Sequence, residues 1–145
     1  MELCINCMAG SIVNGVCNHC HKPAESMDGR VSYALPSRMT LYRQYYIGRV
    51  LGAGGYGITY LAWDLRNNRR VAVKELYPRD NVKRNADRVS ITANHGSEEY
   101  FQHVKESFKR EAQILHTLAD LKDVIEVYHL FELNNTVYYL SLIHI

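Results

Sequence analysis

A cluster of glycines followed by a lysine could bind a phosphate group in this protein. Lys74 ends the apolar run Val71-Ala72-Val73. The glycines precede it in one short segment, Gly52-Ala53-Gly54-Gly55-Tyr56-Gly57. Glycines have no side chains, so their backbone N–H groups can approach phosphate oxygens closely, and a lysine ammonium adds a compact positive charge. A plain glycine-rich turn and a solvated strand-end lysine are the alternatives for each feature taken alone.

The residues after the glycines decide which kind of loop they form. The spacing Gly52-x-Gly54-x-x-Gly57 is shared by dinucleotide-binding folds and protein kinases. In a dinucleotide fold the glycines open a helix, whereas Ile58-Thr59-Tyr60 favours a strand here. The sequence therefore predicts a hairpin loop between two antiparallel strands, with Tyr56 at its tip. The P-loop pattern that ends in Gly-Lys-Ser/Thr is absent.

Lys74 needs an anionic partner to hold it in place, and a helix further along the chain offers one. Apolar residues recur there at steps of three and four, at Phe101, Val104, Phe108, Ala112, Leu115 and Leu118. This stripe predicts a helix that Ser97 can cap and that runs to about Leu118. Glu111 lies close to the stripe, where an unpaired charge is costly. Glu106 is the nearest rival, but it lacks the Ile and Leu that follow Glu111.

The cysteines form a second candidate site. They occur as two pairs, Cys4-x-x-Cys7 and Cys17-x-x-Cys20, with nine residues between them, and Gly10 and Gly15 let the chain turn back. Four thiolates suit a closed tetrahedral zinc site, which is structural. About 20 residues cannot bury a useful core, so the metal would supply the folding energy.

Two alternatives to this ligand set remain. His19 and His21 are spare candidates that we interpret as flanking residues. Redox chemistry of the CxxC pairs usually accompanies a βαβ pattern, which is absent from this segment.

Strand-forming runs surround the glycines and the helix. We expect strands at Tyr45–Leu51, Ile58–Trp63, Arg70–Glu75, Val124–Leu133 and Thr136–Leu140, with Asn134-Asn135 as a hairpin turn. The first three predict an antiparallel meander. Residues 78–96 look polar and irregular. We interpret residues 1–22 as a zinc ribbon, 23–41 as a linker and 42–139 as one packed domain.

Composition limits the function classes. The chain has 145 residues, 47% of them hydrophobic, and a net charge of +2, which is too mild for nucleic acid to be the main partner. The only Lys or Arg in residues 1–22 is Lys22, which argues against a nucleic-acid-binding ribbon. No apolar run approaches the roughly 20 residues of a membrane span. With no signal-peptide pattern, we expect a cytoplasmic protein whose cysteines bind metal.

These motifs together resemble a known family. Residues 45–139 resemble the N-terminal lobe of bacterial eukaryotic-like serine/threonine protein kinases. The resemblance to the bacterial group in particular depends on the segments 51–62 and 74–78. Many members of this group also begin with a short cysteine-rich ribbon.

The resemblance implies an α+β fold: a five-stranded antiparallel sheet with one main helix, preceded by the ribbon. It implies an adenine pocket lined by Leu51, Thr59 and Ala72, and a Lys74–Glu111 pair at the phosphates. Thr59 departs from the usual valine. It also implies Mg-ATP as cosubstrate and protein serine or threonine as phosphate acceptor.

The resemblance stops before the catalytic lobe. The catalytic-loop Asp and Asn and the Asp-Phe-Gly motif do not occur in these 145 residues. We therefore expect the N-terminal part of a kinase, inactive alone, with its magnesium ligands elsewhere. Residues 140–145, Leu-Ser-Leu-Ile-His-Ile, resemble a translated sequencing adaptor, so we interpret them as a non-native tail; a genuine C-terminus is the alternative. An alternative function is a protein-binding zinc-ribbon module attached to a pseudokinase-like remnant.

Overall fold

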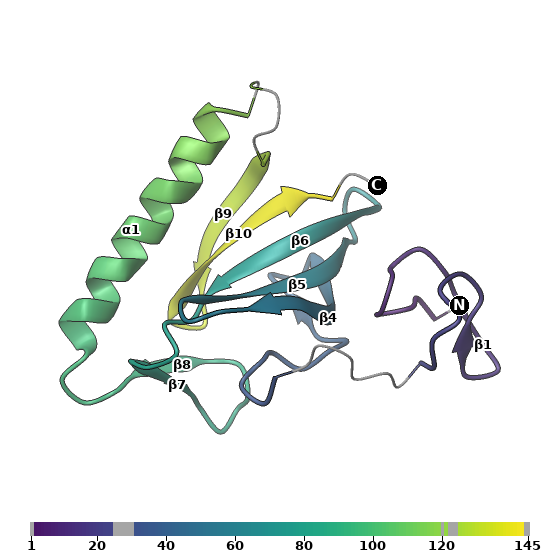
Figure 1. The fold of residues 1–145 in the computed structure, drawn as a ribbon, viewed down its shortest axis with the longest axis horizontal. Coiled ribbons are helices and arrows are strands. Elements are labelled where there is room, and N and C mark those ends of the chain that lie inside the picture. Colours follow the sequence, from purple (N-terminus) through teal and green to yellow (C-terminus); the bar gives the residue numbers. More distant parts are fainter. Residues whose placement is uncertain (1, 25–30, 120, 122–124, 144–145) are drawn as a thin grey trace.

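A six-stranded antiparallel sheet forms the body of the protein in this computed structural model, which describes residues 2–24, 31–119, 121 and 125–143 (Figure 1). The strands follow the order β3-β4-β5-β6-β10-β9. Their bounds are β3 (Thr40–Leu41), β4 (Tyr45–Ala53), β5 (Gly57–Asp64), β6 (Arg69–Leu76), β9 (Val127–Leu133) and β10 (Thr136–Leu142). The five expected strands are confirmed, and β3 adds a short pair of residues at one edge. The expected start of β9 at Val124 lies outside the described residues.

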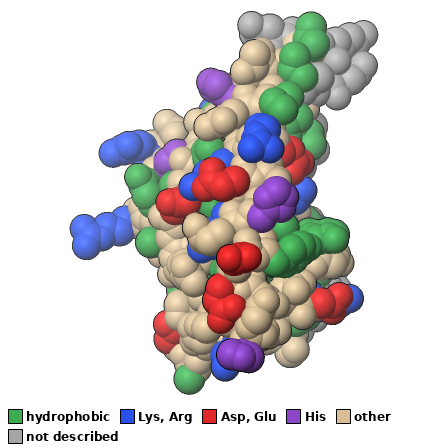
Figure 2. Space-filling model, turned by 90° about the vertical axis from the view of Figure 1, so that its left-hand side faces the viewer, with side chains coloured by type: hydrophobic (Ala, Val, Ile, Leu, Met, Phe, Trp, Pro, Cys, Tyr) green, Lys and Arg blue, Asp and Glu red, His purple; other side chains and the backbone are tan. Residues whose placement is uncertain are grey.

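One helix, α1 (Glu98–Thr117), packs on the sheet beside β9 and β10 (Figure 1). Its predicted apolar stripe is confirmed at Phe101, Phe108 and Ala112, which are buried. Figure 2 shows acidic and basic side chains mixed over the outer face that carries α1, with hydrophobic side chains toward one end. Ile114 and Leu118 are exposed on this helix and just beyond it.

Two segments that the sequence did not predict as ordered structure cover the other face of the sheet. Residues 78–96 contain a hairpin of β7 (Val82–Arg84) and β8 (Ile91–Ala93), where we expected irregular chain. Within the expected linker, Leu35 is buried and its N–H donates to the Tyr60 hydroxyl at 2.9 Å. Runs of two or three residues are too short to show a period, so such elements leave no clear pattern in a sequence.

The cysteine-rich segment forms a separate small hairpin of β1 (Ile12–Val13) and β2 (Val16–Cys17). Asn14 and Gly15 form its turn with φ of 52° and 80°, conformations that Asn and Gly adopt readily. Gly10 is required by close approach, because a Cβ there would lie 2.6 Å from the Cys17 sulfur.

The end of the chain continues the sheet. The Asn134-Asn135 turn has positive φ at both residues, as expected for a tight hairpin. Residues 140–142, assigned from the sequence to a non-native tail, form the last part of β10 and pair with β6. The origin of the tail stays a prediction, and His144 and Ile145 lie outside the described residues. No helix in the described part of the chain is long and apolar enough to cross a membrane.

Candidate nucleotide-binding face and cysteine cluster

The glycine cluster forms the expected hairpin loop between β4 and β5. The Gly54 N–H donates to the Gly57 carbonyl at 2.9 Å, which closes the turn. The carbonyls of Gly55 and Tyr56 accept hydrogen bonds from the amides of Arg79 and Tyr77 at 3.0 and 2.8 Å, so the loop is tied to the segment after β6. The space beside the loop is open, because a Cβ added at Gly52, Gly54 or Gly55 would meet nothing within 4 Å.

Lys74 and Glu111 form an ion pair between β6 and α1. The distance from Lys74 Nζ to Glu111 Oε1 is 3.9 Å, and the two side chains are 38% and 51% exposed. An ion pair this accessible contributes at most about 1 kcal/mol to stability, so its interest lies in its position. The rival Glu106 instead pairs with Lys109 on the helix surface.

The register of the sheet places other predicted site residues beside this pair. Thr59 lies directly opposite Lys74, and Tyr139 lies opposite Lys74 on its other side. Ala72 comes two residues before Lys74, and side chains two apart in a strand share a face. Thr59, Ala72 and Lys74 therefore lie on one face. Leu51 is exposed where the β4–β5 pairing is irregular, next to Gly52, and Ala53 ends β4.

Glu75, next to Lys74, is the centre of a buried hydrogen-bond network that was not predicted from the sequence. Glu75 is fully buried, and both of its oxygens accept from Arg84, at 2.7 and 3.0 Å. The hydroxyls of Tyr60 and Tyr138 also donate to it, at 2.8 and 2.6 Å. Burial raises the pKa of both tyrosines far above its usual value. A carboxylate at a position where the strand alternation requires a buried side chain is the signal that could have revealed it.

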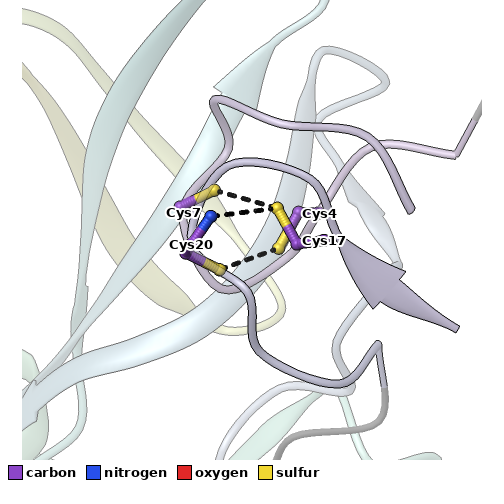
Figure 3. A group of neighbouring side chains, drawn as sticks. All are labelled: Cys4, Cys7, Cys17 and Cys20. Atoms are coloured by element: carbon purple, nitrogen blue, oxygen red, sulfur yellow. Dashed lines mark hydrogen bonds between the residues drawn. The ribbon is translucent and has the colours of Figure 1, made fainter. Parts of the chain in front are cut away.

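The four cysteines converge on one point (Figure 3). The Cys4 and Cys20 sulfurs lie 3.8 Å apart, those of Cys7 and Cys17 lie 3.7 Å apart, and all four fall within 4.8 Å of one another. A tetrahedral zinc with bonds of about 2.3 Å sets its sulfurs roughly 3.8 Å apart. The donor set therefore fits zinc. Among the described residues this group consists of the cysteines alone, without His19 or His21.

Backbone amides around the cluster favour ionised thiols. The Asn6 N–H donates to the Cys4 sulfur and the His19 N–H to the Cys17 sulfur, both at 3.3 Å. Burial opposes ionisation at Cys17, but the amide donors from Cys20 and His19, together with the thiols of Cys4 and Cys20, outweigh it and lower the pKa of this thiol to about 6. At Cys4 burial prevails and raises the pKa to about 12. A divalent cation would favour the thiolate at all four positions.

Comparisons with known proteins bear on the class of this protein. No protein-family model matches the sequence. The chain is 33% identical over 101 residues to the serine/threonine-protein kinase PknA of Nostoc sp. strain PCC 7120, a match over 68% of this chain and 15% of that protein.

Solved structures resemble it as well. The apo form of PpkA-294 superposes with a TM-score of 0.73 at 32% identity, over 77% of this chain and 39% of the other. A crystal structure of another kinase domain, at 16% identity and a TM-score of 0.53, shares the fold.

Sequence and fold together define the class. The sheet and α1 have the architecture of a protein-kinase N-terminal lobe, and the chain belongs to the eukaryotic-like serine/threonine protein kinases, of which it carries an N-terminal portion. The chain spans 15% of the length of the curated relative and 39% of that of the solved structure. The cysteine cluster in front of the lobe fits a zinc ribbon.

Proposed function

We propose that this chain supplies the N-terminal half of an ATP site in a kinase that phosphorylates serine or threonine in proteins. The observation that carries the proposal is the Lys74–Glu111 ion pair beside an open glycine hairpin. Lys74 would bind the α- and β-phosphates of ATP, and Glu111 would hold its ammonium in place. The glycine loop would cover the phosphates, and Leu51, Thr59 and Ala72 would contact the adenine.

The described residues do not fit a magnesium site, although the proposed reaction uses Mg-ATP. Glu111 already pairs with Lys74. Glu75 faces away and its oxygens are taken by Arg84, Tyr60 and Tyr138. We therefore assign no metal-dependent step to this part of the chain.

We further propose that these 145 residues alone transfer no phosphoryl group. Phosphoryl transfer depends on positioning and on charge stabilisation by metal ions, and the sequence lacks the motifs that bind them. Incubation with radiolabelled ATP and a serine-rich protein should give no label above that of a Lys74→Ala variant. Label above that control would refute the proposal.

Nucleotide binding is tested directly by titration. Lys74→Ala should weaken ATP binding at least about tenfold, because it removes the positive charge at the phosphates. Lys83→Ala is the matched control, since Lys83 is an exposed lysine on β7. NMR titration to millimolar ATP would detect weak binding. Equal affinity of wild type and Lys74→Ala would contradict the assigned role.

The cysteine cluster is proposed to hold one structural zinc ion through Cys4, Cys7, Cys17 and Cys20. A closed set of four thiolates leaves no position for substrate, so its contribution would be to folding. The proposed alternative for the whole chain, a protein-binding module built on this ribbon, predicts binding of a protein partner that survives Lys74→Ala.

A further inference from the structure

The ribbon is packed against the sheet. Ile5 and Met8 are almost fully buried and form an apolar cluster with Leu61 of β5. Tyr46 and Trp63 line the same cluster. Ile5 lies between Cys4 and Cys7, and Met8 follows Cys7 directly. The metal-binding segment itself therefore makes the contact.

Hydrogen bonds give this contact a fixed geometry. The Arg49 N–H of β4 donates to the Ile5 carbonyl at 2.9 Å, and Arg49 Nε donates to the Asn6 carbonyl at 2.8 Å. Ile5 and Asn6 are the two residues between Cys4 and Cys7. The sheet therefore holds the loop whose shape a metal ion would set.

Gly48 makes the close approach possible. A Cβ at this position would lie 2.5 Å from the Ile5 carbonyl oxygen and 2.6 Å from the Met8 methyl carbon. The β4–β5 register also shifts between Ile47 and Val50, which is where Gly48 and Arg49 face the ribbon. A glycine at position 48 is therefore needed for the ribbon to pack this closely on β4.

We propose that metal binding by the four cysteines is coupled to docking of the ribbon on β4 and β5, so that loss of the metal uncovers this face of the sheet. A segment of about 20 residues has too little core to keep its shape without metal. When the loop relaxes, its two carbonyls no longer meet Arg49. Leu61 comes two residues after Thr59 on the same face of β5, so the coupling reaches the edge of the proposed nucleotide site. The inference rests on the proposed structural zinc.

Trp63 reports on this contact, because it is the only tryptophan in the chain and lies in the docking cluster. Removal of zinc from wild-type protein with a chelator should shift the Trp63 emission to longer wavelength. Hydrogen exchange at the Arg49 amide should become at least about tenfold faster. The amide of Val73, in the centre of the sheet, is the internal reference.

A substitution separates docking from metal binding. Gly48→Ala should keep one zinc per chain by elemental analysis, while Trp63 emits as in metal-free wild type and no longer responds to the chelator. Gly52→Ala is the matched control, because its added methyl group on the same strand meets nothing. If circular dichroism shows that Gly48→Ala is unfolded, Arg49→Met should reduce the response to the chelator, because it removes the guanidinium that donates to Asn6 and keeps the backbone N–H that donates to Ile5.

Three results would overturn the proposal. If the chelator removes zinc and leaves Trp63 and the Arg49 amide unchanged, the coupling is wrong while the zinc site stands. If folded Gly48→Ala responds to the chelator as wild type does, the contact is not the coupling element. If wild type holds no zinc after refolding with zinc present, the metal site and the coupling both fail, whereas ATP binding is judged separately by titration.

Discussion

Two adjacent residues on β6 show how one step along a strand changes the role of a charge. Lys74 faces α1 and is accessible, with Glu111 as its partner. Glu75 faces the opposite way and is fully buried with Arg84. The accessible pair is suited to a ligand, whereas the buried pair and its two tyrosines join β6 and β10 to the β7–β8 hairpin.

Removal of the buried carboxylate should be strongly destabilising. Glu75→Gln leaves the Arg84 guanidinium buried without its counter-ion, so we expect a loss of about 3–5 kcal/mol in the free energy of unfolding. Glu132→Gln removes an accessible partner of Lys109 and should cost less than about 1 kcal/mol. Urea unfolding of the two variants measures the difference. Equal losses would mean that the Glu75–Arg84 pair does not hold the hairpin to the sheet.

At the level of elements, α1 is held by its packing more than by its cap. Ser97 occupies the N-cap position, but its side chain makes no capping hydrogen bond and its Oγ accepts instead from Asn81. Phe108 is buried, and its ring centroid lies 5.1 Å from that of Tyr139 on β10. Glu111 follows Phe108 by almost one turn, so this contact also positions Glu111.

Because packing holds α1 more than its cap does, substitutions at Phe108 and Ser97 should lower the free energy of unfolding by different amounts. Phe108→Ala should lower the free energy of unfolding by about 3–5 kcal/mol, because it opens a cavity between α1 and the sheet. Ser97→Ala should cost less than the roughly 1 kcal/mol typical of a bonded cap. Thermal or urea unfolding followed by circular dichroism compares them. A larger cost for Ser97→Ala would show that the N-terminus of the helix controls its stability.

At the level of the whole molecule, the sheet curls until strands that are not neighbours meet. Three strands separate β4 from β9 in the sheet order, yet the Tyr45 hydroxyl hydrogen-bonds His129 Nδ1. The rings of Tyr45 and Phe131 also stack, with centroids 6.1 Å apart. This closure buries the core between the curled strands.

The closure should make stability depend on pH. Burial lowers the pKa of His129 below its ordinary 6.5, with Asp64 opposing this shift and Arg66 adding to it. The unfolded chain therefore binds a proton more readily than the folded one. The stabilisation is complete above pH 6.5 and is lost as the pH falls toward the lower pKa of the folded state. Urea midpoints at pH 7.5, 6.5 and 5.5 should decline, and less steeply in His129→Gln. The same slope in both proteins would exclude His129 as the cause.

Local patterns in the sequence were sufficient to predict the main helix and the long strands. Runs of strand-forming residues predicted the five long strands, and apolar residues at steps of three and four predicted α1. The structure confirms these elements within the residues that it describes. The glycine hairpin, the Asn134-Asn135 turn and the convergence of the cysteines also follow from residue types and spacing. Such signals act within a few residues, so the sequence alone contains them. The roles of Lys74, Glu111 and the adenine-contacting residues stay predictions.

Only the tertiary structure showed which residues that are distant in the sequence contact one another. The short β3 and β7–β8 strands, the packing of Leu35, and the Glu75–Arg84 network depend on residues brought together across the fold. The docking of the cysteine ribbon on Gly48 and Arg49 joins segments more than 40 residues apart. A hydrogen bond or an apolar contact forms wherever the folded chain brings two residues together. When these residues are far apart in the sequence, no periodic pattern marks them as partners. For that reason the sequence determined the elements and the candidate ligands, while the fold determined their neighbours.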